Sequence, residues 1–232
     1  MQPPSDRPWI IAHRGASAAE RENTLAAFRV ARDLGADAVE FDVRRTADGV
    51  LVVHHDPAVD GVGPLPTTPM RDLRSAAPWV PTLEEALAAC DGMWVNAEIK
   101  NAPSEPGFDP DDEVLAAVVD AIPPGTLITS FNPTTVARSL REAGSHRTGL
   151  LVLEGVDPFA VLDTAAPYDT VHPAVEDVRN ADLGAVVRGA GARRLQVVVW
   201  TVDDPDEVRA LAAAGVAGII TNVPDVALAA LD

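Results

Sequence analysis

Two pairs of charged residues in this sequence have the spacing of a catalytic site. Glu40 and Asp42 are two apart in one apolar run, and Glu98 and Lys100 are two apart at the end of another. Residues two apart on a strand lie on the same face. Three carboxylates brought together would repel one another, and one would bind a proton unless a cation lay among them. All-oxygen ligands favour Mg²⁺ or Ca²⁺, so we predict Glu40, Asp42 and Glu98 as metal ligands.

Three histidines near these pairs are candidates for moving protons. His13 begins a His-Arg-Gly motif after one apolar run, and His54 and His55 end another run. Imidazole accepts and donates protons near neutral pH, and phosphodiester cleavage needs both a base and an acid. Adjacent strand residues point to opposite faces, so only one of His54 and His55 faces the carboxylates. We predict His13 and His55 as the acid–base pair, and His54 is expected either to have a structural role or to support the catalytic residues from behind.

The positive charges point to an anionic ligand. Lys100 is the only lysine beside seventeen arginines, and its compact ammonium suits a single phosphate oxygen. Arg14 offers a planar fork for the same group. His172 and Trp200 each end a later apolar run and are candidates either for lining the pocket or for filling the barrel. Asn23 is predicted as the N-cap of the first helix.

A structural interpretation of the same residues stays open at this point. Glu40 and Asp42 could be solvated strand ends that pair with Arg44 and Arg45, and His13 could be a hydrogen-bonded structural histidine. The additional charged pair Glu98 and Lys100 favours the catalytic interpretation.

Alternating strand-like and helix-like runs predict the scaffold. Helix-like runs separate most of the apolar runs, a pattern typical of parallel strands closed into a barrel. The expected strands cover 9–13, 38–43, 50–54, 94–99, 127–129, 149–153, 170–172, 196–200 and 218–221, and the expected helices include 24–34, 82–89, 113–122, 134–143 and 205–214. The sequence therefore predicts a (β/α)₈ barrel over 1–232 as one domain.

The third strand-like run is predicted to lie outside the barrel. Only a short turn containing Asp48 and Gly49 separates it from the second run, which favours an antiparallel hairpin. A turn centred before Asp48 would pair residues whose numbers sum to about 95, placing His55 opposite Glu40 at the barrel mouth. A small insertion with a single helix is expected between this hairpin strand and the third barrel strand.

The amino-acid composition indicates which binding partners and which cellular compartment to expect for this protein. The net charge of −17 argues against nucleic acid or stable membrane association, because both partners are polyanions. No apolar run approaches the roughly 20 residues of a membrane helix, and the N-terminus has no apolar signal core. Cys90 is the only cysteine, which fits a reducing compartment. We expect a cytoplasmic protein without an obligatory protein partner.

Several motifs, in this order, resemble the glycerophosphodiester phosphodiesterase family. They are His13-Arg14-Gly15, Glu22-Asn23-Thr24, Glu40-Phe41-Asp42-Val43, Thr46-x-Asp48-Gly49, His55-Asp56, Glu98-Ile99-Lys100, Ser130-Phe131, Trp200-Thr201-Val202 and Gly218-Ile219-Ile220-Thr221. The resemblance implies hydrolysis of a small anionic glycerophosphodiester to glycerol 3-phosphate and an alcohol. It also implies His13 and His55 as acid and base, Glu40, Asp42 and Glu98 on Mg²⁺ or Ca²⁺, and Arg14 and Lys100 on phosphate.

Two departures and two alternatives accompany this resemblance. Arg21 stands where the family usually has proline, and the segment after Asp56 is too short for the cap domain of some relatives. The alternatives are a lysophospholipase D or sphingomyelinase D-like phosphodiesterase on the same barrel, and a barrel that only binds phosphorylated ligands.

Overall fold

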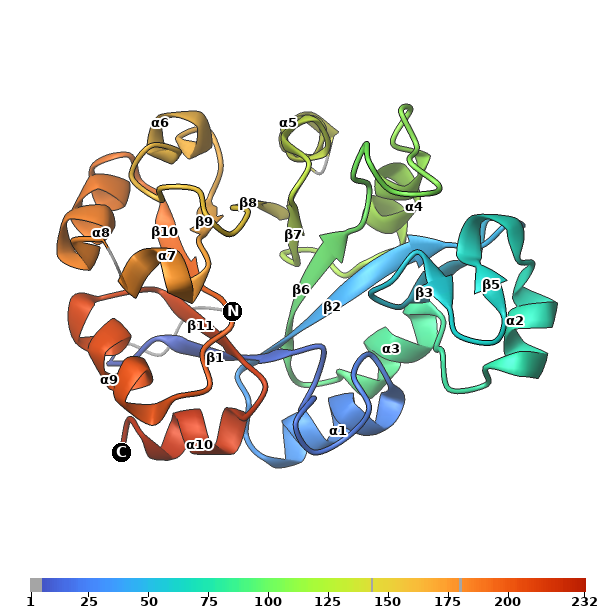
Figure 1. Cartoon of the computed structure of the whole chain (residues 1–232), viewed down its shortest axis with the longest axis horizontal. Helices are drawn as coiled ribbons and strands as arrows, with labels where there is room; N and C mark the ends of the chain where they lie inside the picture. Colours follow the sequence, from blue (N-terminus) through green and yellow to red (C-terminus); the bar gives the residue numbers. More distant parts are fainter. Residues whose placement is uncertain (1–5, 143, 180) are drawn as a thin grey trace.

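Eight parallel strands of the described residues close into a barrel (Figure 1). The computed structural model describes residues 6–142, 144–179 and 181–232. Strand β1 (Trp9–His13) pairs with both β2 (Ala38–Arg45) and β11 (Gly218–Thr221), which closes the barrel. Residues 1–5, part of the predicted signal-free N-terminus, and Ala143, the predicted last residue of helix 134–143, lie outside the described ranges. The predicted (β/α)₈ barrel is confirmed.

The remaining elements follow the predicted alternation. The other barrel strands are β6 (Trp94–Ile99), β7 (Leu127–Ser130), β8 (Arg147–Leu151), β9 (Thr170–His172) and β10 (Gln196–Val199). The helices around them are α1 (Leu25–Asp33), α3 (Leu83–Ala89), α4 (Glu113–Ala121), α5 (Pro133–Glu142), α6 (Leu162–Ala165), α7 (Val175–Arg179), α8 (Leu183–Ala192), α9 (Pro205–Ala214) and α10 (Pro224–Ala229). None of these helices has both the length and the hydropathy of a membrane span.

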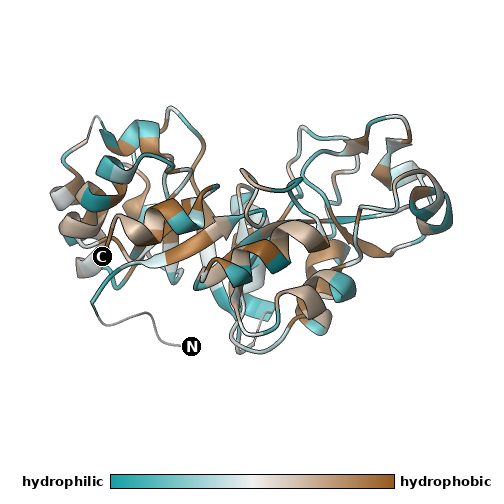
Figure 2. Cartoon of the chain, turned by 90° about the horizontal axis from the view of Figure 1, so that it is seen from below, coloured by the Kyte–Doolittle hydropathy of each residue, from teal (hydrophilic) through white to brown (hydrophobic). Residues whose placement is uncertain are grey.

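The helices cover the outer face of the barrel with mixed surfaces. Figure 2 shows hydrophobic and hydrophilic residues side by side along the same helices. In α1 the buried Phe28 packs against Phe41 of β2, with ring centroids 5.8 Å apart. Burial of such apolar faces is the main stabilising contribution to a barrel of this kind.

The hairpin strand lies outside the barrel, as predicted, but its register differs by one residue. Strand β3 (Leu51–Val53) pairs antiparallel with the end of β2, with Val43 opposite Val53. The Thr46 N–H donates to the Val50 carbonyl at 3.0 Å, so the turn centres on Asp48 instead of before it. The predicted pairing of His55 with Glu40 is therefore wrong, and β3 ends before His55.

The insertion after β3 is small, as expected, but it adds a helix to α3, whereas the sequence predicts a single helix between the hairpin strand and β6. It consists of β4 (Ala58–Val59), β5 (Gly63–Pro64), a 3₁₀ turn (Leu65–Thr67) and α2 (Met70–Ala76). No side chain caps the N-terminus of α2, so the usual start signal is missing from the sequence. Leu65 and Leu73 are buried together against Val52 of β3, and the insertion thereby supports the hairpin.

The barrel interior changes from apolar to charged along the strands. Trp9 and Trp94 lie near the N-terminal ends of their strands, with ring centroids 4.7 Å apart. On the same strands the C-terminal ends carry His13 and Glu98. The charged end is the barrel mouth, where barrel enzymes place their active sites.

Candidate active site

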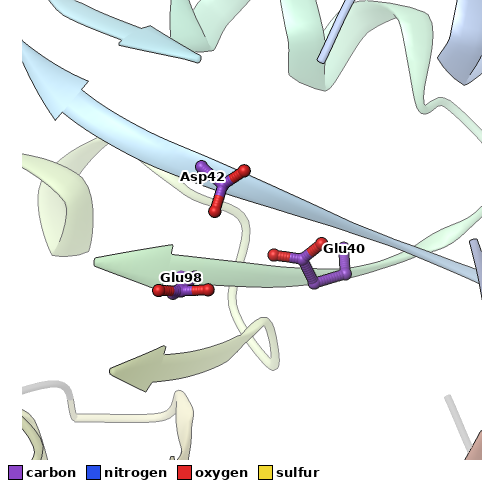
Figure 3. A group of neighbouring side chains, drawn as sticks. All are labelled: Glu40, Asp42 and Glu98. Carbon is purple, nitrogen blue, oxygen red and sulfur yellow. The ribbon is translucent and has the colours of Figure 1, made fainter. Parts of the chain in front are cut away.

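Three buried carboxylates form the centre of the barrel mouth. Glu40 and Asp42 come from β2 and Glu98 from the neighbouring β6, where Asp42 lies opposite Glu98 (Figure 3). Each contributes an oxygen, and these oxygens all lie within 4.8 Å of one another. Buried Glu40 Oε1 accepts no hydrogen bond from any described residue. Oxygen ligands at this spacing, one of them unpaired, fit a hard divalent cation.

The pKa values of these three carboxyl groups are shifted because the groups are buried close together and beside two cations. Burial and the neighbouring Asp42 and Glu98 raise the pKa of Glu40 well above its ordinary value. Burial raises the pKa of Glu98 to about 7, although Lys100 opposes the shift. For Asp42, Lys100 and Arg14 outweigh the effect of burial and hold the pKa below its ordinary range. Without a cation, burial and the neighbouring carboxylates therefore favour the protonated form of Glu40.

Replacing Glu40 by Gln is expected to stabilise the metal-free protein at neutral pH. A carboxyl whose folded-state pKa is raised favours folding below its unfolded pKa, and this contribution is lost as the pH rises through the folded pKa. Wild type in EDTA should therefore lose free energy of unfolding relative to Glu40→Gln as the pH rises above the unfolded pKa of glutamate, about 4.3. Denaturant unfolding measures the difference, with the exposed Glu20→Gln as control. A pH-independent difference would contradict the prediction.

Two cations lie directly beside the carboxylates. Lys100 Nζ is 2.9 Å from Asp42 Oδ1 and 2.5 Å from Glu98 Oε1. Arg14 Nε is 3.2 Å from Asp42 Oδ2, and the Arg14 backbone N–H donates to Glu40 Oε2 at 3.1 Å. Both predicted phosphate ligands therefore lie at the site. Their positive charges offset the negative charges of the carboxylates.

Gly15 allows the loop after β1 to reach this position. Its φ of +85° favours glycine, and an added Cβ would lie 2.7 Å from backbone and side-chain carbon atoms of Ala27. The loop therefore packs directly on α1, which holds Arg14 over the mouth.

His13 is held in one tautomer by residues from two other loops. Its Nδ1 lies 2.8 Å from Asn222 Oδ1. That oxygen also accepts from the Ser17 hydroxyl at 2.7 Å, while Asn222 Nδ2 donates to Asp203 at 2.7 Å. His13 Nδ1 must therefore carry the hydrogen, leaving Nε2 as an acceptor. Burial and nearby Arg14 lower the pKa of His13, which favours the neutral ring.

His55 lies at the pocket, whereas His54 contacts the insertion. His55 Nδ1 is 2.8 Å from Asp56 Oδ1, and burial lowers the pKa of the ring although Asp42 opposes the shift. The His54 ring packs against Trp79 with centroids 5.6 Å apart. The positions agree with the predicted division between the two histidines, in spite of the shifted register.

One pocket of about 160 Å³ joins His13 and His55 to both cations and to two of the three carboxylates. It is lined by His13, Arg14, Glu40, His55, Glu98, Lys100, Phe131, Leu151, Trp200 and Ile220. Trp200 thus lines the pocket, and its ring meets Phe131 edge-on, with ring centroids 5.5 Å apart.

His172 is fully buried inside the barrel and is not part of this pocket lining. Its Nε2 lies 2.8 Å from Thr170 Oγ1. Burial lowers the pKa of His172 to about 3, as expected for a residue that fills the barrel.

Asn23 is not the helix cap that the sequence analysis predicts. Thr24 is the N-cap of α1, and its hydroxyl accepts from the Ala27 N–H at 3.3 Å. Asn23 has a φ of +56°, a conformation that asparagine tolerates better than most residues. Its side chain donates to Asp42 Oδ2 at 2.6 Å. Asn23 therefore orients a predicted metal ligand, a role that its place in the Glu-Asn-Thr motif alone did not indicate.

The alternative pairing of Glu40 and Asp42 with neighbouring arginines is wrong. Arg44 NH2 lies 2.9 Å from Glu105, and Arg45 NH1 lies 2.7 Å from Glu113. Both carboxylates are buried, so they are not solvated strand ends.

The mouth of this barrel brings together carboxylates, cations and two histidines. This combination indicates the class of barrel enzymes that act on anionic substrates. The model of the glycerophosphoryl diester phosphodiesterase family matches residues 13–226. A glycerophosphodiester phosphodiesterase from Caldanaerobacter subterraneus subsp. tengcongensis is 32% identical, covering 93% of this chain and 94% of that protein. The chain belongs to this family and is a phosphoric diester hydrolase.

Solved structures show the same architecture. A phosphodiesterase from Oleispira antarctica, determined in complex with the product sn-glycerol-3-phosphate, superposes with a TM-score of 0.81 at 25% identity. The match covers 97% of both chains. A glycerophosphodiester phosphodiesterase from Thermotoga maritima has a TM-score of 0.80 at 24% identity, covering 96% of this chain and 97% of that one, which supports the fold.

Proposed function

We propose that the enzyme hydrolyses glycerophosphodiesters to glycerol 3-phosphate and an alcohol by acid–base catalysis with two histidines. The observation that carries this proposal is one pocket that joins two of the three carboxylates, Glu40 and Glu98, and both cations to His13 and His55. The Oleispira antarctica relative was determined with the product sn-glycerol-3-phosphate, which supports a small anionic glycerophosphodiester as the substrate.

Each group has a distinct task in this proposal. Glu40, Asp42 and Glu98 would hold Mg²⁺ or Ca²⁺, and the bound ion would offset negative charge on the phosphate. Arg14 and Lys100 bind phosphate oxygens and create a local positive centre in a chain of net charge −17. Against that background, these two side chains orient an anion at the mouth.

The histidines move the protons. Nδ1 of His13 is hydrogen-bonded to Asn222, and Nδ1 of His55 faces Asp56. In both rings Nε2 is therefore available for proton transfer. One ring accepts a proton from the attacking oxygen, and the other donates a proton to the leaving alcohol. Both pKa values are lowered, which favours the neutral ring that the accepting step needs.

A coupled assay for glycerol 3-phosphate tests this function. The substrates are glycerophosphodiesters with choline, ethanolamine, glycerol and inositol headgroups, each with EDTA, Mg²⁺ or Ca²⁺. We expect metal-dependent release of glycerol 3-phosphate from at least one substrate. No release under any condition, or full activity in EDTA after exhaustive stripping of metal, would contradict the proposal.

One surface feature favours lysophospholipids as a second candidate substrate class. The segment after β8, at the C-terminal end of the barrel, exposes Leu153 (61%) and Phe159 (51%). Exposed apolar residues on this side would suit an acyl chain. The same assay with lysophosphatidylcholine, scored by choline release, separates the two candidates, because a glycerophosphodiesterase restricted to small substrates would leave it intact.

A further inference from the structure

Arg44 is a buried cation that the proposed chemistry does not use. It follows Glu40 and Asp42 on the same face of β2, and its side chain is only 7% exposed. Burying a guanidinium is costly unless charged or polar partners compensate it. Its partners therefore indicate what it contributes.

The first partner is the backbone of His55. Arg44 Nε donates to the His55 carbonyl oxygen at 2.7 Å. Strand β3 ends at Val53, and the last hairpin hydrogen bond joins the His54 N–H to the Asp42 carbonyl at 3.0 Å. The backbone at His55 therefore lies beyond the sheet and is held by a side chain.

The second partner lies on the loop that follows Lys100. Arg44 NH2 is 2.9 Å from Glu105 Oε2. This loop is braced by Asn101, whose side chain exchanges two hydrogen bonds with the Asp109 backbone, each 2.8 Å long. One guanidinium thus connects the segment that carries His55 with the loop beyond Lys100.

We propose that Arg44 is a positioning residue that holds the His55 imidazole in the pocket and anchors it to the loop after Lys100. This inference rests on the proposed role of His55 in catalysis. A displacement of a catalytic group by about 1 Å can lower the rate by about 100-fold. Loss of Arg44 should therefore lower kcat, while phosphate and metal ligands stay in place.

Arg44→Met tests the proposal, with Arg45→Met as a matched control. Arg45 lies on the same strand and contacts Asp109 and Glu113, so it tethers the same region without reaching His55. We expect Arg44→Met to lower kcat by about 10- to 100-fold with KM changed by less than about threefold. Arg45→Met should stay close to wild type. Equal losses in the two variants would overturn the proposal.

A double-mutant cycle separates positioning of His55 from a general structural effect. If Arg44 acts through His55, adding Arg44→Met to His55→Ala should cause no further loss of kcat. Losses that multiply would refute the proposal. An undiminished His55→Ala enzyme would instead refute the proposed role of His55, and the two failures are thereby distinguishable.

Two further variants cover the case in which Arg44→Met does not fold. Arg44→Lys keeps the charge but loses the planar fork that reaches both partners, so it should recover part of the kcat lost in Arg44→Met. Glu105→Gln leaves the His55 contact intact and should lower kcat less than Arg44→Lys does. Its loss should also vanish in the His55→Ala background. Circular dichroism and a metal-binding isotherm are measured for each variant. If Glu105→Gln still lowers kcat in the His55→Ala background, the proposal that Arg44 anchors His55 to the loop after Lys100 is overturned.

Discussion

His55→Ala should lower kcat by about 100-fold or more, whereas His54→Ala should keep most of the activity. The His55 ring lines the same pocket as Glu40 and Glu98. The His54 ring packs against Trp79 of the insertion instead, and its Nδ1 lies 3.0 Å from the Asp56 carbonyl oxygen. Steady-state kinetics at saturating metal and substrate measure the contrast.

Thermal unfolding provides the control for this pair of variants. His54→Ala should lose stability because it removes a packed ring, and His55→Ala should unfold near the wild-type temperature, since its side chain is 37% exposed. An inactive His54→Ala together with an active His55→Ala would show that the two histidines have exchanged roles.

Lys100→Arg should fold normally and lose about 100-fold or more in kcat, as expected when a charge-stabilising donor is misplaced. Lys100 Nζ fits between Asp42 and Glu98, and the side chain is 9% exposed. Burial opposes the charged form, but both carboxylates raise the pKa of Lys100 above its ordinary value. A guanidinium keeps the charge but is wider and presents its donors in a plane, so it cannot occupy the same space.

The alternative for Lys100 is a side chain that extends to solvent, where arginine would serve equally well. The observed burial between two carboxylates argues against it. Arg74→Lys, which alters the pair between Arg74 of α2 and Glu85 of α3, is a suitable control for a general effect of exchanging the two residue types. Equal kcat for wild type and Lys100→Arg would remove Lys100 from the phosphate site.

Local sequence pattern was sufficient to predict the barrel and to predict that most candidate site residues lie close together. Strand alternation places Glu40 with Asp42 on one face, and Glu98 with Lys100 on the next strand, because the side-chain period of a strand is two. The short Asp48-Gly49 turn predicted an antiparallel strand outside the barrel for the same local reason. The candidate site residues lie together because the ends of adjacent parallel strands must meet at one mouth.

Tertiary structure alone decided which residues support that site. Asn23 contacts Asp42, Asn222 contacts His13, and Arg44 contacts the backbone of His55. These pairs are separated by 19, 209 and 11 positions in the chain, and no local periodicity relates their side chains. The hairpin register also depended on a turn one residue longer than the pattern implied, since Thr46 pairs with Val50. Spacing along one strand is determined by backbone geometry, whereas contacts between loops are determined by how the whole barrel closes.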